Sequence, residues 1–341
     1  MTNNSTYRFP AEWEKSDAIL LSWPHADTDW NYMLEKVTEC YLNVVKAITR
    51  FMPVIIVAPQ KETVTSCLPK DLMSKVTICE TPTNDTWARD FGPITLLDCD
   101  NNPVLLDFKF NAWGLKFAAD KDNLITKNLF ENKYITGIYQ NHLGFVLEGG
   151  SIETDGTGLL LTTSECLLSP NRNGDMSKSE IESYLKSTLN IKKVLWLNHG
   201  FLKGDDTDSH IDTLARLAPN NNILYVKCSN EKDIHFEELS KMEKELKTFT
   251  NTLNEPLTLV PLPLPDPIYE DGERLPATYA NYLVTEKAVF VPVYGQQKDA
   301  LALKQIQKVF PAKEIVPIDC NALISQHGSL HCITMQLYTK K

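Results

Sequence analysis

Short apolar runs and longer amphipathic stretches alternate along the whole of this 341-residue chain. A short apolar run bounded by polar or turn residues is typical of a buried strand. Such strands are predicted at 18–23, 53–58, 103–108, 159–163, 193–197, 223–227, 257–262, 281–285 and 288–293. Because helical patterns lie between the strands, the chain is predicted to belong to the α/β class.

The helical spacing of apolar residues occurs in five longer stretches, at 31–50, 121–131, from Ser177 onward, 232–249 and 298–309. Ser177 and Glu180 have the spacing of a capping box, which marks the start of a helix. The last four helices follow one another at similar intervals, which suggests a repeated unit. The pattern predicts either a doubly wound sheet or a closed repeat of small sheets. The first strand is not followed by the G-x-G-x-x-G motif of many doubly wound proteins.

Composition limits which binding partners and which cellular location are expected. The net charge of −10 argues against nucleic acid, because binding it requires lysine and arginine to neutralise phosphates. The eight cysteines form no CxxC pair, which argues against a zinc cluster and a disulfide scaffold. The start of the chain lacks a basic segment followed by an apolar run, and no apolar run is long enough to span a bilayer. A cytoplasmic protein without a membrane partner is therefore expected.

Two clusters place a carboxylate within two residues of a glycine. In "DTWARDFGPI" (85–94), Asp90 either caps a turn and pairs with Arg89 or lies at a pocket mouth beside the aromatic wall of Trp87. In "VLEGGSIETDGTGLLLTT" (146–163), Asp155 and Gly156 predict a hairpin turn. Glu148 precedes two glycines, which indicate a close approach of the backbone to another group. Its carboxylate is either solvated or held for a function.

The stretch "GDDTDSHIDTLARL" (204–217) is rich in groups that bind cations or transfer protons. If it is extended, residues of equal parity share a face, so Asp206, Asp208, His210 and Asp212 point the same way. Three carboxylates and a histidine on one face are costly unless they meet a cation or a proton-transfer task. The alternatives are a solvated acidic loop and a divalent metal site.

The last cluster, "QHGSLHCITMQL" (326–337), has the apolar pattern of a strand and contains Cys332. A cysteine in such a strand is most often a small apolar core residue. His331 is adjacent in sequence but would point to the opposite face of a strand. The residues alone therefore leave open whether Cys332 is a core residue, a ligand or a nucleophile beside Gly328.

Together these motifs resemble the agmatine deiminase family, and they are similar to bacterial-type peptidylarginine deiminases. "FPAEWEKSDAILLSWPHADTDW", "WARDFGP", "FNAWG", "LEGGSIE", "DTDSHIDTLAR", "LPATYANYLV", "VPVYGQQKDALAL" and the late "HC" occur in the family's order over nearly the whole chain. The resemblance implies a single catalytic domain over 1–341. Its expected fold is a five-bladed α/β propeller, or pentein, of ββαβ-type modules around a central site.

The resemblance also implies roles for individual residues. Cys332 matches the nucleophile and His210 the general acid and base. Asp90 and Asp212 match the carboxylates that grip the substrate guanidinium. Glu148 matches the acidic residue that supports the histidine.

At the mouth, Trp87 and Trp113 match aromatic positions, and Asp206 lies where the family has a residue near the substrate tail. The implied substrate is a small cationic guanidine, with no cofactor and no metal, and a homo-oligomer is left open. Gln326, His327 and Ser329 stand where the family commonly has a more glycine-rich loop. The shape of that loop is therefore not implied.

The implied reaction is hydrolysis of agmatine to N-carbamoylputrescine and ammonia through an amidino-cysteine intermediate, a step of polyamine and putrescine biosynthesis. A thiolate is a strong enough nucleophile for a guanidinium held by carboxylates. One alternative is a deiminase that converts free or peptidyl arginine to citrulline. A second is a metal-dependent hydrolase that uses Asp206, Asp208, His210 and Asp212. Amidino transfer and a non-catalytic binding propeller are the remaining alternatives.

Overall fold

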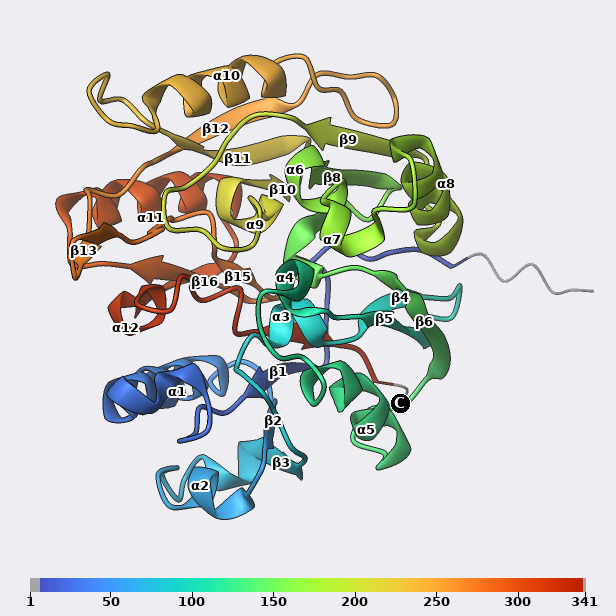
Figure 1. The fold of residues 1–341 in the computed structure, drawn as a ribbon, viewed down its shortest axis with the longest axis vertical. Helices are drawn as coiled ribbons and strands as arrows, with labels where there is room; N and C mark the ends of the chain where they lie inside the picture. Colours follow the sequence, from blue (N-terminus) through green and yellow to red (C-terminus); the bar gives the residue numbers. More distant parts are fainter. Residues whose placement is uncertain (1–6, 340–341) are drawn as a thin grey trace, which may run out of the picture.

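The computed structural model describes residues 7–339 and contains several small sheets instead of one continuous sheet (Figure 1). The first sheet has the strand order β18 (Met335–Leu337), β1 (Ala18–Ser22), β2 (Val54–Ala58) and β3 (Val76–Glu80). The second contains β4 (Ile94–Leu97), β5 (Pro103–Lys109) and β6 (Ile138–Val146). The third contains β7 (Ile152–Thr154), β8 (Leu159–Thr163) and β9 (Lys193–Leu197).

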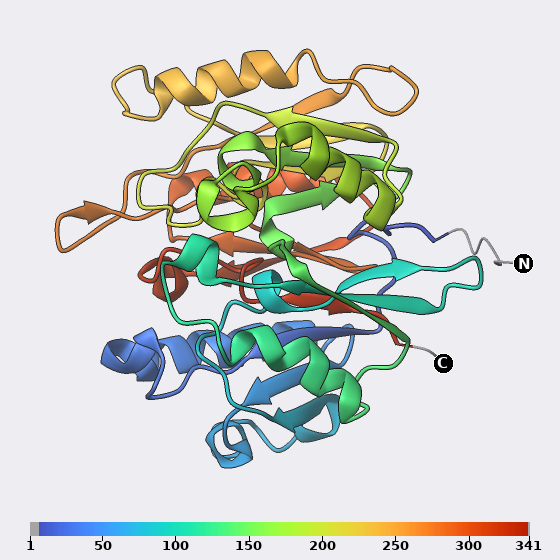
Figure 2. The same cartoon turned by 45° about the vertical axis from the view of Figure 1, so that its right-hand side comes forward.

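The remaining sheets lie in the second half of the chain. The fourth contains β10 (Ala215–Ala218), β11 (Asn222–Lys227) and β12 (Thr258–Pro263). The fifth contains β15 (Leu283–Val284), β16 (Ala288–Val293) and β17 (Glu314–Asp319). A separate hairpin of β13 (Tyr269–Glu270) and β14 (Glu273–Arg274) projects from the body, in orange in Figure 2. The prediction of a doubly wound sheet is therefore wrong for the described residues.

One topology recurs in these five sheets. An antiparallel pair is followed by a parallel pair, and one long helix connects the parallel strands. Parallel strands need such a crossover because the end of one strand and the start of the next lie at opposite ends of the sheet along the strand direction. The crossover helices are α1 (Leu34–Ile48), α5 (Ile125–Glu131), α8 (Lys178–Leu189), α10 (Phe236–Leu246) and α11 (Gln297–Val309). They lie around the outside of the molecule in Figure 1.

The first sheet joins the two ends of the described chain. Its antiparallel pair consists of β1 and β18, in which Ala18 lies opposite Leu337. All the other strands of the sheet come from the first quarter of the sequence. The last strand therefore completes a unit that the N-terminal segment begins.

Burial explains the predicted strands and helices. All residues of β1, β2 and β8 are buried, which accounts for their uninterrupted apolar sequences. Helix α1 buries a stripe that includes Val37, Val44 and Ile48. The predicted capping box is present in α8, where Ser177 and Glu180 exchange hydrogen bonds. Five helices and the hairpin turn between β7 and β8 are thus confirmed.

The remaining helices are short and connect these units. They are η1 (Asp29–Met33), α2 (Lys61–Thr65), η2 (Met73–Lys75), α3 (Ala88–Phe91), α4 (Ala112–Leu115), η3 (Asp122–Leu124), η4 (Gly149–Ser151), α6 (Ser164–Leu167), α7 (Pro170–Asn173), α9 (Ile211–Leu214) and α12 (Asn321–Ile324). Labels for α3, α4 and α9 stand near the middle of Figure 1. Over residues 7–339, the structure contains no helix with the length and apolar character that crossing a bilayer requires.

Two predicted extended segments have a different backbone. Residues 204–217 turn at Asp208 and Ser209, which have φ angles of 65° and 61°, and then form α9 and β10. The extended backbone on which a shared face of Asp206, Asp208, His210 and Asp212 depends is therefore not formed. The segment 326–337 is a strand only at Met335–Leu337, and Cys332 lies in the turn before it. Its apolar residues are buried through turns instead of by alternation along a strand.

Candidate active site

The predicted site residues occupy similar places in successive units. Asp90 lies in α3 before β4, and Glu148 lies directly before η4 and β7. Asp212 lies in α9 before β10, and Cys332 lies in the turn before β18. Each residue therefore precedes the first strand of an antiparallel pair. The repeated topology brings groups that are distant in sequence to one place.

A cavity of about 180 Å³ adjoins these segments. Its described lining consists of Asp29, Asp85, Trp87, Asp90, Trp113, Phe117, Asp206, Thr207, Gln326, His327, Gly328 and Cys332. The lining thus includes four carboxylates and three aromatic rings, but no described lysine or arginine. Of the predicted mouth residues, Trp87, Trp113 and Asp206 all line this cavity.

Gly150 is the point at which three polar side chains meet. A Cβ atom added there would lie 2.7 Å from Nδ1 of His210, 2.8 Å from Oδ1 of Asp90 and 3.1 Å from Oδ2 of Asp212. The backbone amide of Gly150 donates to Oδ1 of Asp90 at 2.9 Å. The close backbone approach expected from the double glycine is therefore confirmed.

Asp90 is buried and accepts a second hydrogen bond. Nε1 of Trp113 donates to its Oδ2 atom at 2.9 Å. Burial, and next the nearby charge of Asp212, raise the pKa of Asp90 well above its usual value, although both donors oppose the shift. Its carboxylate therefore lacks a compensating positive charge, which a cationic ligand in the cavity would supply.

Asp212 is completely buried, and only one of its two carboxylate oxygens has a hydrogen-bond partner among the described residues. Nδ1 of His331 lies 2.7 Å from its Oδ2 atom, whereas Oδ1 has no partner among the described residues. Burial alone would raise the pKa of Asp212. The hydrogen bond and charge of His331 bring that pKa below its usual value. Asp212 is therefore an ionised carboxylate with one oxygen free for a ligand.

His210 is a buried neutral imidazole. Burial lowers its pKa to about 3. Its Nδ1 atom is 3.7 Å from Oδ1 of Asp90, and Nε2 has no described hydrogen-bond partner. A neutral imidazole with an unpaired nitrogen can accept a proton.

Glu148 pairs with an arginine that the sequence did not single out. Nε of Arg172 donates to both carboxylate oxygens, at 2.9 Å and 3.0 Å. The same guanidinium contacts Oδ2 of Asp208 at 2.6 Å and the carbonyl oxygen of Thr207 at 2.8 Å. Arg172 lies in the polar segment around α7, which gave no signal of a site. It ties Glu148 to the loop that precedes His210.

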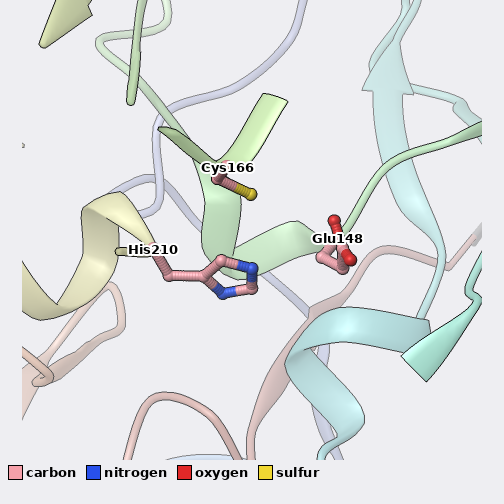
Figure 3. Close-up of side chains that lie close together, drawn as sticks. All are labelled: Glu148, Cys166 and His210. Carbon is pink, nitrogen blue, oxygen red and sulfur yellow. The ribbon is translucent and has the colours of Figure 1, made fainter. Parts of the chain in front are cut away.

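Figure 3 shows Glu148, Cys166 and His210 close together, with one potential ligand atom of each within 4.8 Å of the others. Both oxygens of Glu148 are already bound by Arg172. Burial raises the pKa of Cys166 well above its usual value, so it is a neutral thiol and a weak ligand. This donor set does not fit a metal ion.

The quartet considered from the sequence does not form a metal site either. Among the described residues, the groups of three or more potential ligands are Glu148 with Cys166 and His210, and Glu12 with Glu153 and His331. Asp206, Asp208 and Asp212 belong to neither group. Asp208 instead binds Arg172 and Nζ of Lys116.

Cys332 contacts Asn281, another residue that the sequence did not single out. Oδ1 of Asn281 accepts from the amides of His331 and Cys332, at 2.9 Å and 3.3 Å, which fixes the orientation of its side-chain amide. Sγ of Cys332 is 3.4 Å from the same oxygen. Burial, then Asp212 and Asp90, raise the pKa of the Cys332 thiol well above its usual value. The unliganded site therefore holds a neutral thiol.

The mouth has an unusual backbone. Residues Ala112, Trp113, Gly114 and Leu115 all have positive φ angles, and Trp113 has φ 55° and ψ 44°. This strained turn directs Nε1 of Trp113 to Asp90. His327 also has a positive φ, of 65°, on the opposite loop. A side chain at Gly328 would collide with the indole of Trp87, which explains the glycine beside the cysteine turn.

Comparison with known proteins gives consistent relatives. A Lactococcus lactis protein provisionally named agmatine deiminase is 35% identical, over 97% of this chain and 95% of its own length. A structure provisionally named arginine deiminase, from Porphyromonas gingivalis, has a TM-score of 0.92 at 47% identity, covering 97% of this chain and 98% of that one. Substrate-bound C. jejuni agmatine deiminase, with serine replacing one cysteine, has a TM-score of 0.92 at 38% identity.

The last structure covers 98% of this chain and 97% of its own. A profile described as Porphyromonas-type peptidyl-arginine deiminase matches residues 8–337. The match thus includes all the site segments described above. This chain belongs to the Porphyromonas-type peptidyl-arginine deiminase family.

Proposed function

We propose that this protein is an agmatine deiminase that forms N-carbamoylputrescine and ammonia through a covalent intermediate on Cys332. The observation that carries the proposal is the meeting of two buried carboxylates and a neutral imidazole at Gly150, beside an acidic cavity that Asp90 and the Cys332 thiol line. Names of relatives in the same family agree with this activity.

Asp90 and Asp212 bind the guanidinium. Both carboxylates are buried beside Gly150, and Oδ1 of Asp212 has no described partner. A planar guanidinium presents N–H donors that match carboxylate oxygens and remove the cost of two nearby negative charges. Binding the cation also favours ionisation of Asp90 and of the Cys332 thiol, because both have raised pKa values in the empty site.

In the first half of the reaction, the thiol proton passes to His210 and Sγ of Cys332 bonds to the guanidinium carbon. His210 returns that proton to an amino group of the tetrahedral adduct, the C–N bond breaks and ammonia leaves. A cationic S-alkyl amidino group remains on Cys332. Between these two proton transfers His210 is an imidazolium. Glu148 lies close enough to stabilise it, because a carboxylate oxygen of Glu148 and a ring nitrogen of His210 are within 4.8 Å of each other.

In the second half, His210 accepts a proton from water and the oxygen adds to the same carbon. The C–S bond breaks, Cys332 recovers its thiol and one proton is released with the ureido product. Water must therefore reach the site after ammonia leaves. This requirement separates a deiminase from an amidinotransferase.

The five sheets favour a five-bladed propeller as the arrangement behind this site. Each contains an antiparallel pair followed by a parallel pair with a helical crossover, the first sheet has β3 in addition, and β18 closes on β1. A ring of such units places the segments before each antiparallel pair at the centre. The chain then acts as one catalytic domain. A homo-oligomer and a cytoplasmic location remain predictions.

A second candidate is deimination of free or peptidyl arginine, which the name of the P. gingivalis structure favours. An arginine α-carboxylate needs a cationic or backbone partner at the mouth. The described cavity lining contains Asp29, Asp85 and Asp206 but no lysine or arginine. Lys116 lies nearby, but its Nζ atom is used by Asp208 and the carbonyl oxygen of Asp206. An amine at the substrate tail suits this mouth better.

The test is the ratio of kcat/KM values for agmatine, free arginine and a C-terminal arginine peptide, measured as ureido product. Agmatine is expected to exceed both arginine substrates by at least about 100-fold, the effect of a mismatched buried charge. Activity is expected to survive EDTA. An equal or larger kcat/KM for arginine would contradict the substrate, and inactivation by EDTA that added metal reverses would contradict the mechanism.

A further inference from the structure

His331 lies beside the proposed nucleophile but has no role in the steps above. It is completely buried between two carboxylates. Its Nδ1 atom is 2.7 Å from Oδ2 of Asp212. Its Nε2 atom is 2.8 Å and 3.0 Å from the two oxygens of Glu12. The imidazole therefore bridges one substrate-binding carboxylate to a residue outside the cavity.

Glu12 anchors this bridge to two buried arginines. Nη1 of Arg89 and Nη2 of Arg216 donate to its two oxygens, at 2.9 Å and 2.6 Å. Arg216 also pairs through Nε with Glu153. A second cavity of about 40 Å³ is lined by Glu12, Arg89 and Glu153, and it shares no lining residue with the substrate cavity. The bridge is thus fixed from a separate part of the interior.

The partners of His331 indicate which ring nitrogen carries the proton. Besides Glu12, Nη2 of Arg216 lies 3.1 Å from Nε2, and a guanidinium can only donate. Burial, then Arg216 and Arg89, lower the pKa of His331, so its imidazole is neutral. These findings assign Nε2 as the acceptor from Arg216 and Nδ1 as the donor to Asp212 at 2.7 Å.

We infer that Glu12 and His331 form a positioning unit that holds Asp212 ionised, with Oδ1 turned toward the guanidinium. The inference rests on the proposed function, because it assigns the unit to guanidinium binding. Without the Nδ1 donor, Asp212 would be a buried carboxylate with no described hydrogen bond from a side chain. Such a group protonates more readily and binds a cation less well.

Other titratable groups also face Asp212 and affect its ionisation. They are His210 before its own helix, Asp90 in α3, Glu153 in β7, Arg216 in β10 and Cys332 in the turn before β18. Arg216 favours the ionised form of Asp212, whereas Asp90 and a Cys332 thiolate oppose it. His331 is the only described group with a hydrogen bond to its side chain. A change at His331 should therefore affect Asp212 most directly.

Two polar variants separate the two ends of the bridge. His331→Asn retains an N–H donor near the place of Nδ1 and loses the contact with Glu12. His331→Gln places its N–H donor near Nε2, so it retains the contact with Glu12 and loses the donor to Asp212. The pair has similar polarity, so general effects on folding should be alike.

The assay is kcat and KM for agmatine across pH, with thermal unfolding of each variant. Asp90 and Asp212 both act when ionised, so activity is lost as pH falls through the pKa values of the pair. Loss of the hydrogen bond to Asp212 makes that pair harder to ionise and moves the acid limb of kcat/KM upward. His331→Gln is expected to raise KM roughly 10- to 100-fold and to move the limb by at least about one pH unit. His331→Asn is expected to keep the limb within about half a unit of wild type.

His142→Asn is the matched control, since this partly buried histidine bonds Tyr184 and no site residue. An unchanged acid limb in His331→Gln, or a shift of a full unit in His331→Asn, would overturn the inference. If His331→Gln does not fold, a shift of the acid limb by a full unit in His331→Asn would still overturn the inference. Wild-type enzyme that forms no ureido product from any guanidine would refute the proposed function instead, so the two failures are distinct.

Discussion

Glycine occupies two positions at which the site leaves no room for a side chain. At Gly150 a Cβ atom would press on His210 and on both carboxylates. At Gly328 it would collide with the ring of Trp87. The φ angle of neither glycine lies in the left-handed region, so space and not backbone conformation excludes other residues. These positions show how the polar groups and the turn with Cys332 can approach so closely.

Gly328→Ala should therefore misplace the turn that carries Cys332. We expect kcat/KM for agmatine to fall at least about tenfold, because a displacement near 1 Å costs up to about 100-fold in rate. Overpacking should also lower the free energy of unfolding by about 1–3 kcal/mol. Steady-state kinetics and urea unfolding measure the two effects.

Gly144→Ala is the matched control, because no atom lies within 4 Å of the Cβ position there. It should leave both quantities close to wild type. Wild-type kinetics in Gly328→Ala would show that the contact with Trp87 does not position the cysteine turn.

At the scale of elements, the sequence predicted the parts with regular apolar patterns. Predicted strands such as 159–163 and 193–197 coincide with β8 and β9, and the helix after Ser177 is present. The periodicity reports burial of one face or of a whole strand. The segments that carry the site have no such periodicity, because turns and short helices bury their residues.

The incorrect predictions from the sequence therefore lie mainly in the segments that form the candidate active site. Asp208 and Ser209 adopt left-handed backbone conformations, so His210 and Asp208 diverge where a strand would have aligned them. Asp208 instead meets Arg172, and Cys332 is held by Asn281. These partners are distant in sequence, and no local sequence pattern predicts the contacts. The resemblance to a known family, not the periodicity, selected Cys332 as nucleophile.

At the scale of the whole molecule, the last strand closes the first sheet. β18 pairs with β1, and Gln336 of β18 also accepts a hydrogen bond from Arg89 at 2.6 Å. Arg8 and Thr339 line the same surface cavity, so the described ends of the chain are neighbours. In a closed ring of units, the position of the chain ends should have little effect on folding or on activity.

A circular permutant tests this expectation. The natural ends are joined by a short flexible linker, and new ends are opened at Gly272 in the exposed hairpin between β13 and β14. We expect native circular dichroism and kcat/KM within about tenfold of wild type, as exposed loop tips tolerate such breaks. A linear molecule that deletes Met335–Leu337 should unfold. A folded, active deletion variant would contradict the role of closure.

The central claim is that the substrate carbon becomes bonded to Cys332. The direct measurement is intact and peptide mass spectrometry of enzyme quenched with acid during turnover of isotopically labelled agmatine. The account predicts one labelled adduct, equal to agmatine minus ammonia, on the peptide containing Cys332. Cys332→Ala should form neither this adduct nor ureido product. Turnover without an adduct, or an adduct on Cys166, the thiol that lies beside His210, would contradict this mechanism.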